Sequence, residues 1–271
     1  MLTDKTLAVL GAGKLGETLI RGLADAGAVS PAQVTVTAGH AERVEKLAAE
    51  LGVRGALSNA DAVRGADLVI LAVKPQTVAA VLAEISGVLE PAQLLISVAA
   101  SVGTTYIEKH LRAAVPVVRA MPNTPALLKK GMTALAPGTH ATRAHLEQAR
   151  AIFGAVGRTL VLDEKHMDAV TGLSACGPAF IYIVIESLAE AGVKVGLPRD
   201  VATELAAQTV MGAGAMVVET GEHPALLKDL VTTPAGCTID GILELEEGGL
   251  RVTLIKAVVR STERARELLE S

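Results

Sequence analysis

The sequence predicts an α/β protein in which an N-terminal, doubly wound sheet of the Rossmann type precedes an all-helical C-terminal domain. Two observations support this prediction. Over roughly the first 160 residues, short apolar runs alternate with amphipathic helical patterns, as in the repeated βα units of a right-handed, doubly wound sheet. After this point the chain continues with helical patterns that Gly and Pro separate. We therefore expect one domain at residues 1–162 and a second at residues 163–271.

The expected strands follow in order along the first domain. Their ranges are Thr6–Leu10, Val34–Thr37, Asp67–Val73, Gln93–Val98, Val115–Ala120 and Thr159–Leu162. The run at Asp67–Val73 is continuously apolar, which is typical of a strand buried on both faces of a parallel sheet. Behind the first strand, Leu15, Leu19 and Leu23 recur at helical spacing.

The expected helices of the second domain lie at about residues 164–174, 176–192, 198–220, 235–247 and 250–269. The stretch at residues 202–218 is rich in Ala and Gly, so another helix can approach it closely. Packing within one chain would also explain this composition. The length of the stretch and the absence of a charged stripe after Glu204 favour an interface between subunits.

Composition excludes several classes of partner. The net charge of −4 provides no electrostatic attraction to nucleic acid or to an anionic membrane. The longest uncharged stretches, Pro91–Ile107 and Ala169–Ile185, are shorter and more polar than the about 20 apolar residues of a membrane span. Two cysteines, Cys176 and Cys237, form no disulfide framework, and the N-terminus does not resemble a signal peptide. These features predict a cytoplasmic protein without a membrane or nucleic-acid partner.

A glycine-rich loop, Gly11–Gly16, follows the first strand and begins a helix. Its pattern, GAGKLG, is short enough to arise by chance, so its position between strand and helix carries the inference. In that position Gly11 makes the tight turn, Gly13 lets the backbone approach a pyrophosphate, and Gly16 lets helix pack on strand. We expect the helix N-terminus to bind a nicotinamide dinucleotide. A glycine turn without a ligand is the alternative.

The end of the second strand bears on the choice of cofactor. An enzyme that uses NAD usually carries Asp or Glu there, to bond the ribose 2′-hydroxyl. The segment Thr35–His40 contains no acid, and His40 and Arg43 are candidate partners for a 2′-phosphate. Both could instead be solvated residues at the start of a helix. The pattern favours NADPH, with NADH as the alternative.

Two further loops, Ala72–Pro75 and Met121–Pro125, fall where strands of the sheet would end and where such folds bind ligands. The second loop could also be a rigid connector. The six histidines show no compact metal-ligand spacing, so no metal site is expected. Ser174 and Cys176 only approach a nucleophile-elbow pattern; they are better explained as a helix-cap or packing residue and a small buried hydrophobe.

In the second domain, Lys228–Thr238 reads as a turn that leads into a helix. The first N–H groups of such a helix could bind a small carboxylate. The Thr238 hydroxyl could donate to a substrate nitrogen or cap the helix, and spacing alone favours the cap.

Several segments in order resemble the pyrroline-5-carboxylate reductase family. They are AVKPQ (72–76), SVAAS (97–101), VVRAMPNTPA (117–126), TGLSACGPA (171–179), GLPR (196–199), HPALLKD (223–229) and TTPAGCTIDG (232–241). The resemblance spans nearly the whole chain. It implies an NAD(P)H-dependent reduction of a cyclic imine to L-proline, in proline biosynthesis. It also implies that the helical domain forms intertwined homodimers, often assembled into a decamer of five dimers.

The resemblance also assigns roles to residues, beside those expected from the sequence pattern. The expected cofactor-binding residues are Gly11, Ala12, Gly13, Lys14, Leu15, Gly16, His40, Arg43, Asn59, Ala72, Val73, Lys74, Pro75, Ala100, Met121 and Asn123. The expected substrate-binding residues are Glu164, Thr233, Gly236, Cys237 and Thr238, with Thr238 as the catalytic hydrogen-bond partner of the ring nitrogen. A readily protonated imine needs no metal or covalent nucleophile, which agrees with this inventory.

Ala235, Cys237, Ala175 and Ser101 depart from the residues that are usual in this family; all but Cys237 replace customary glycines. An alanine with positive φ at 235 would be strained by about 1 kcal/mol. Two rival functions follow from the residues. A dehydrogenase for a β-hydroxy acid would need a catalytic lysine, for which Lys194 and Lys228 are the candidates. A nucleotide-binding sensor without turnover would explain the departures at 235 and 237.

Overall fold

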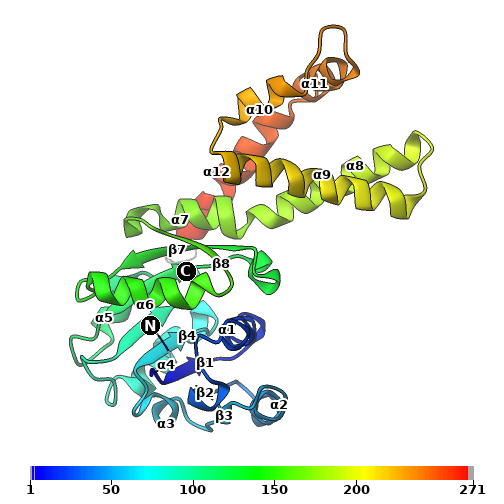
Figure 1. Ribbon diagram of the computed structural model, residues 1–271. Helices are drawn as coiled ribbons and strands as arrows, with labels where there is room; N and C mark the ends of the chain where they lie inside the picture. The colour runs from blue at the N-terminus through cyan, green and yellow to red at the C-terminus, as the bar shows by residue number, and fades with distance from the viewer. Residues whose placement is uncertain (1, 3, 268–271) are drawn as a thin grey trace. The chain divides into compact units, whose positions relative to one another are not determined.

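The structure is a computed structural model, which describes residue 2 and residues 4–267 (Figure 1). The chain divides into two compact units. The first comprises the described residues up to Ala175 together with the chain from Arg260 onward, and the second is Cys176–Val259. Met167 is fully buried against Met121 and Ala134, so the segment after the last strand packs with the sheet. The domain boundary expected after residue 162 stays a prediction.

The first unit is built on one eight-stranded sheet. The strands are β1 (Leu7–Leu10), β2 (Val34–Val36), β3 (Arg54–Gly55), β4 (Leu68–Leu71), β5 (Leu94–Ser97), β6 (Val117–Met121), β7 (Gly131–Pro137) and β8 (Gly157–Val161). Their order across the sheet is β3-β2-β1-β4-β5-β6-β7-β8. All six strands expected from the sequence are present, whereas β3 and β7 were not expected.

The sheet is not parallel throughout. The strands from β3 to β6 are parallel, but β7 runs antiparallel to β6, and β8 is parallel to β7. The connection between Met121 and Gly131 explains the reversal. A parallel crossover needs a dozen or more residues, roughly, and this connection is shorter. The chain therefore turns back beside β6.

Helices cover both faces of the sheet. They are α1 (Lys14–Asp25), α2 (Ala41–Leu51), α3 (Asn59–Val63), α4 (Val78–Ile85), α5 (Thr104–Lys109), α6 (Arg143–Gly154) and α7 (Met167–Val170). Side chains alternate along β1, so Leu7 and Val9 join one buried cluster and Ala8 and Leu10 the other. The first cluster includes residues of α1, α2 and α6, and the second includes residues of α3, α4 and α5. The doubly wound arrangement is thus confirmed.

The second unit is helical. Its helices are α8 (Gly177–Lys194), α9 (Arg199–Thr220), α10 (Pro224–Leu230), α11 (Cys237–Glu247) and α12 (Leu250–Glu267), whose last turns belong to the first unit. Among the described residues no strand follows Val161, as expected. The short α10 was not expected; Pro224 begins it, and Nδ1 of His223 accepts a hydrogen bond from the Ala225 N–H at 3.2 Å. The expected end of the last helix at residue 269 lies outside the described residues.

The helix expected at about residues 164–174 is replaced by three shorter helical segments. A 3₁₀ turn at Glu164–His166 leads into α7, and a π-helical turn follows at Thr171–Ala175.

The long helices of the second unit expose large apolar side chains. Of α9, only Ala202 and Ala206 are buried, whereas Met211 is 60% exposed. By length and composition alone, the stretches Glu164–Lys194 and Arg199–Thr220 could each cross a membrane. Exposed apolar faces of this extent mark a surface that another molecule covers. Together with the small residues of α9, they favour an interface with a second copy of the chain.

Candidate functional site

The glycine loop adopts the geometry that its sequence predicts. Gly11 has φ +79°, and a Cβ atom on it would lie 2.4 Å from Cγ1 of Val73. A Cβ atom on Gly16 would lie 3.1 Å from Cγ1 of Val9, because α1 packs closely on β1. Gly13 is the N-cap of α1 and provides no side-chain cap. At the N-terminus of α1 the backbone is therefore closely packed and its first N–H groups are not capped by a side chain, an arrangement that can bind a phosphate.

A chain of hydrogen bonds connects this loop to the start of α3. The Gly11 N–H donates to Oγ1 of Thr37 at 3.3 Å, and that hydroxyl donates to Oδ1 of Asn59 at 2.6 Å. Nδ2 of Asn59 donates in turn to Oε2 of Glu84 at 2.7 Å. Asn59 therefore holds Thr37 against the turn at Gly11, on the same edge of the sheet as the glycine loop.

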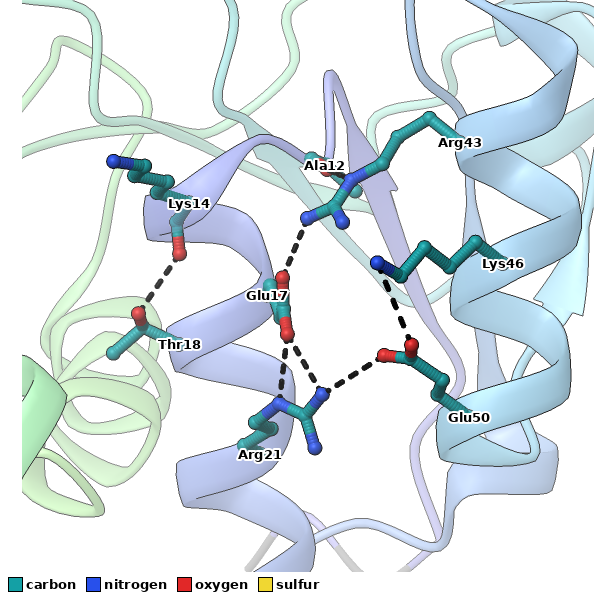
Figure 2. A network of polar contacts seen from close by, with 8 residues as sticks. All are labelled: Ala12, Lys14, Glu17, Thr18, Arg21, Arg43, Lys46 and Glu50. Carbon is teal, nitrogen blue, oxygen red and sulfur yellow. Dashed lines mark hydrogen bonds and ion pairs between the residues drawn. The ribbon is translucent and has the colours of Figure 1, made fainter.

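His40 and Arg43 lie at the start of α2 and differ in their surroundings. His40 is the exposed N-cap of α2, without a side-chain cap bond. Arg43 reaches back to α1, where its Nη2 pairs with Oε2 of Glu17 and its Nε donates to the Ala12 carbonyl at 3.4 Å (Figure 2). Arg43 is thus held against the glycine loop, and the alternative of a solvated helix-start residue does not describe it.

The ends of β4 and β5 lie at the same edge. The Ala72 N–H donates to the Leu10 carbonyl at 2.8 Å, which places Val73 beside Gly11. Lys74 then begins the 3₁₀ turn Pro75–Thr77. After β5, Ala100 packs against the cluster that contains Met121.

A hollow of about 230 Å³ lies between the start of α1 and the loop after β6. Its walls are Lys14, Leu15, Thr18, Pro122, Asn123, Thr124, Ala126, Leu127 and Ala175, and they are mostly apolar. The side chain of Asn123 fixes one wall. Its Oδ1 accepts from the Met132 N–H at 2.9 Å, and its Nδ2 donates to the Ser174 carbonyl at 3.2 Å. The loop after β6 is therefore not merely a rigid connector, because it and α1 together line this cavity.

Ser174 is not the helix N-cap that was one of its two expected roles, and Cys176 is only half-buried, not fully buried as expected. Ser174 lies within the π-helical turn and is not a helix N-cap. Cys176 is half-buried at the N-cap of α8, and Cys237 is exposed. Neither the geometry nor the hydrogen bonds around Ser174 provide a base for a nucleophile.

A buried cluster of charges in the first unit was not predicted from the sequence. Arg119 on β6 is 3% exposed; its Nη1 lies 3.6 Å from Oε1 of Glu164 and its Nη2 lies 3.5 Å from Oδ1 of Asp168. Glu164 also accepts from Thr104, through the backbone N–H at 2.7 Å and through the hydroxyl. Both oxygens of Glu164 are thus engaged inside the first unit. An arginine within the apolar run VVRAM was the available signal, because a buried cation needs carboxylate partners.

The loop expected to bind substrate lies in the second unit. The Gly236 N–H donates to the Thr233 carbonyl at 2.9 Å, closing a turn with Ala235 at φ +59°. A Cβ atom on Gly236 would lie 2.3 Å from Oγ1 of Thr233 and 3.0 Å from its carbonyl oxygen, so a side chain there would displace the Thr233 hydroxyl. Gly236 is the N-cap of α11 and has no side-chain cap bond.

Thr238 is in the first turn of α11 and is not its cap. In the described part of the chain, no hydrogen bond is made by its half-buried hydroxyl. The structure therefore removes the helix-cap explanation for Thr238 and leaves a hydroxyl beside an uncapped helix N-terminus.

Two family models match the chain. Residues 164–268 match pyrroline-5-carboxylate reductase dimerisation, and residues 6–101 match NADP oxidoreductase, coenzyme F420-dependent. The chain is 44% identical to a pyrroline-5-carboxylate reductase of Methanosarcina acetivorans, over 98% of this chain and 99% of that protein. It is 37% identical to the enzyme of that name from Escherichia coli, over 99% of this chain and 100% of that protein.

Solved structures show the same similarity. A pyrroline-5-carboxylate reductase from Coxiella burnetii superposes with a TM-score of 0.92 at 34% identity, covering 98% of this chain and 99% of the other. A Plasmodium falciparum pyrroline carboxylate reductase with NADP bound has a TM-score of 0.88 at 29% identity, with 98% of each chain covered.

Proposed function

Because the chain belongs to the pyrroline-5-carboxylate reductase family, we propose how its two units share the reaction of that family. The protein is an NAD(P)H-dependent oxidoreductase that reduces pyrroline-5-carboxylate to proline, and it acts as a homo-oligomer. The first unit holds the cofactor and the second holds the carboxylate and ring nitrogen of the substrate. The proposal that the second unit binds the substrate is supported chiefly by one observation: the Thr238 hydroxyl lies at the uncapped N-terminus of α11.

The cofactor is proposed to lie along the carboxyl edge of the parallel strands. Its pyrophosphate would lie on the N-terminus of α1, where Gly11 and Gly16 leave no room for a side chain. The loops that carry Asn59, Lys74 and Ala100 border the same edge. When bound, NAD(P)H supplies the hydride that the imine carbon accepts.

We propose a preference for NADPH over NADH. The support is the position of Arg43, whose guanidinium reaches the Ala12 carbonyl of the glycine loop. The segment Thr35–His40, at the end of β2, contains no acidic residue to bond a ribose 2′-hydroxyl. His40 is exposed at the start of the same helix and adds a second candidate partner for the 2′-phosphate.

The substrate carboxylate would be held by the first N–H groups of α11, where the helix dipole favours a negative charge. Thr233, Gly236 and Cys237 shape this end of the helix, and the Thr238 hydroxyl is the hydrogen-bond partner of the ring nitrogen. Reduction adds hydride to the imine carbon and leaves a proton on the nitrogen. The protein's contribution is mainly position, since a protonated imine accepts hydride without a metal or a covalent intermediate.

For Glu164 the proposal is an indirect one. Both of its oxygens accept hydrogen bonds from Thr104, and one lies near Arg119. We propose that it acts by holding the start of α5 in place rather than by contacting the substrate directly.

The finer assembly and location are also proposals: a decamer of five dimers, in the cytoplasm, without a membrane or nucleic-acid partner. The exposed apolar faces of α8 and α9 would then be covered by the partner subunit. Light scattering of the purified protein measures the number of subunits. A dimer that does not associate further would reject the decamer.

The reaction is tested by following NADPH oxidation with pyrroline-5-carboxylate as substrate. We expect turnover that depends on both compounds and produces proline. Tight NADPH binding without turnover would reject the enzyme and favour a nucleotide-binding sensor, in which Ala235 and Cys237 have removed activity.

A further inference from the structure

Five charged side chains of alternating sign connect α1 to α2 beside the glycine loop (Figure 2). In order they are Arg43, Glu17, Arg21, Glu50 and Lys46. Nη2 of Arg21 lies 2.7 Å from Oε1 of Glu17 and 3.2 Å from Oε2 of Glu50, and Nζ of Lys46 lies 3.7 Å from Oε1 of Glu50. The end of this row that touches the glycine loop is the cation Arg43.

The two contacts of Arg43 use one edge of its planar guanidinium. Nε donates to the Ala12 carbonyl, and Nη2 donates to Oε2 of Glu17. Arginine has five N–H donors, and two adjacent ones can bind two oxygens of a phosphate at once. In the described part of the chain, Nη1 of Arg43 makes no hydrogen bond. The outer edge, Nη1 and Nη2, is therefore available to an anion at the glycine loop.

Glu17 is shared between two arginines. Oε2 contacts Arg43 and Oε1 contacts Arg21, and the side chain is 22% exposed. The hydrogen bonds from Arg43 and then Arg21 hold the pKa of Glu17 below its usual value. The carboxylate is thus charged at neutral pH, but it is divided between two cations. Glu17 therefore orients Arg43, and this one carboxylate cannot neutralise both arginines.

We propose that Glu17 is a positioning residue for the selection of NADPH: it holds the Arg43 guanidinium against the glycine loop, with the outer edge presented to the cofactor 2′-phosphate. This inference rests on the proposed role of Arg43 in binding that phosphate. A long side chain ordered before the ligand arrives loses less freedom on binding, so affinity rises. The advantage applies only to the cofactor that carries the phosphate.

The test compares kcat/KM for NADPH with kcat/KM for NADH in variants of the full-length oligomer. Glu17→Ala is expected to lower this ratio by about two- to tenfold, the range expected when one long side chain must be ordered on binding. The change should appear in KM for NADPH, with kcat and the kinetics with NADH unchanged. Glu17→Gln keeps one acceptor oxygen, so its ratio should lie between those of the parent and of Glu17→Ala.

Glu50→Gln is the matched control. It removes the charge that pairs with Arg21 but leaves the ion pair between Glu17 and Arg43 intact. It should leave the ratio unchanged. A general loss of stability would affect both cofactors equally, so the ratio separates positioning from folding.

Arg43→Ala separates this inference from the proposal on which it rests. If Arg43→Ala leaves the ratio unchanged, Arg43 does not bind the 2′-phosphate and the proposed NADPH site is wrong. If Arg43→Ala lowers the ratio but Glu17→Ala does not, only the role of Glu17 is rejected. A higher ratio in Glu17→Ala would show that Glu17 competes with the phosphate for Arg43. In the double variant, Glu17→Ala should add no further loss, since it acts through Arg43.

Discussion

The guanidinium of Arg119 lies inside the first unit with its Nη1 3.6 Å from Oε1 of Glu164. The same carboxylate accepts hydrogen bonds from Thr104, the first residue of α5. One buried ion pair therefore joins three segments that are distant in sequence: β6, the start of α5 and the turn after β8. Asp168, 3.5 Å from Nη2, adds a second carboxylate to the same cation.

Replacing Arg119 by Met should strongly destabilise the first unit. The change leaves two carboxylates without their buried counter-charge, which costs about 3–5 kcal/mol in the free energy of unfolding. Denaturation by urea, followed by circular dichroism, measures the loss. Arg119→Lys retains the positive charge, so its loss of stability should be smaller than that of Arg119→Met. Some loss should remain, because lysine cannot contact both carboxylates in the same way.

The exposed Arg158→Met, on β8, is the control and should change stability by less than about 0.5 kcal/mol. Equal urea midpoints for Arg119→Met and Arg158→Met would show that the buried pair contributes nothing.

The sheet was largely predictable because its strands are short, continuously apolar runs. β4 and β5 are buried along their whole length, so each appears in the sequence as an almost continuous apolar run. β3 has only two residues, and β7 contains Gly, Thr and Pro, so neither has such a pattern. The direction of β7 depends on the length of the connection before it, which no local pattern expresses.

The site was predictable where function depends on backbone shape. Gly11 and Gly16 are required by contacts with near neighbours, so their pattern is visible in the sequence. The partners of Arg43 and Arg119 are set by how distant elements pack, and charged residues with no local pattern supply them. The cap of α11 shows the same limit, because a glycine in the N-cap position leaves Thr238 within the helix.

Ala235→Gly should stabilise the protein. Ala235 has φ +59°, which costs an L-residue about 1–2 kcal/mol, whereas glycine adopts this conformation freely at the expense of a more flexible unfolded chain. The net gain should be about 0.5–1 kcal/mol. Thermal unfolding at equal protein concentration measures it. Ala175→Gly is the matched control, since Ala175 has no positive φ and should lose about 0.5–1 kcal/mol. Equal shifts for both variants would contradict the argument.

Ser101→Gly should also stabilise the protein, for two reasons. Ser101 has φ +63°, and its buried hydroxyl has no hydrogen-bond partner in the described structure. Removing the strain and the unpaired hydroxyl should raise the free energy of unfolding by about 1–2 kcal/mol. Ser101→Ala removes only the hydroxyl and should gain less than Ser101→Gly. If both variants unfold at a lower urea concentration than the parent, Ser101 makes a contact that stabilises the loop.

The Glu17 ion pairs should make stability depend on pH in the acid range. Its pKa is lowered from 4.5 by the hydrogen bonds with Arg43 and Arg21, so the folded state binds the proton less readily than the unfolded state. The stabilisation is complete above the unfolded value of 4.5 and is lost as pH falls through the lower folded value. Glu17→Gln should lose about 0.5–1 kcal/mol at neutral pH. The difference from the parent should shrink as pH falls below 4.5.

Glu45→Gln, on the exposed side of α2, is the comparison for that titration. A pH-independent difference between the parent and Glu17→Gln, measured by urea denaturation, would reject the linkage.

Thr238→Val should reduce catalysis without affecting the fold. Valine has nearly the shape of threonine but lacks the hydroxyl proposed to meet the ring nitrogen, so the barrier should rise by about 1–3 kcal/mol, or roughly 5- to 150-fold in kcat/KM. Gly236, not Thr238, is the N-cap of α11, so urea denaturation should show unchanged stability. NADPH affinity should also be unchanged, and Thr238→Ser should recover most of the activity. If Thr238→Val turns over at the parental rate, another group of the enzyme must meet the nitrogen, and Thr238 only packs within the first turn of α11.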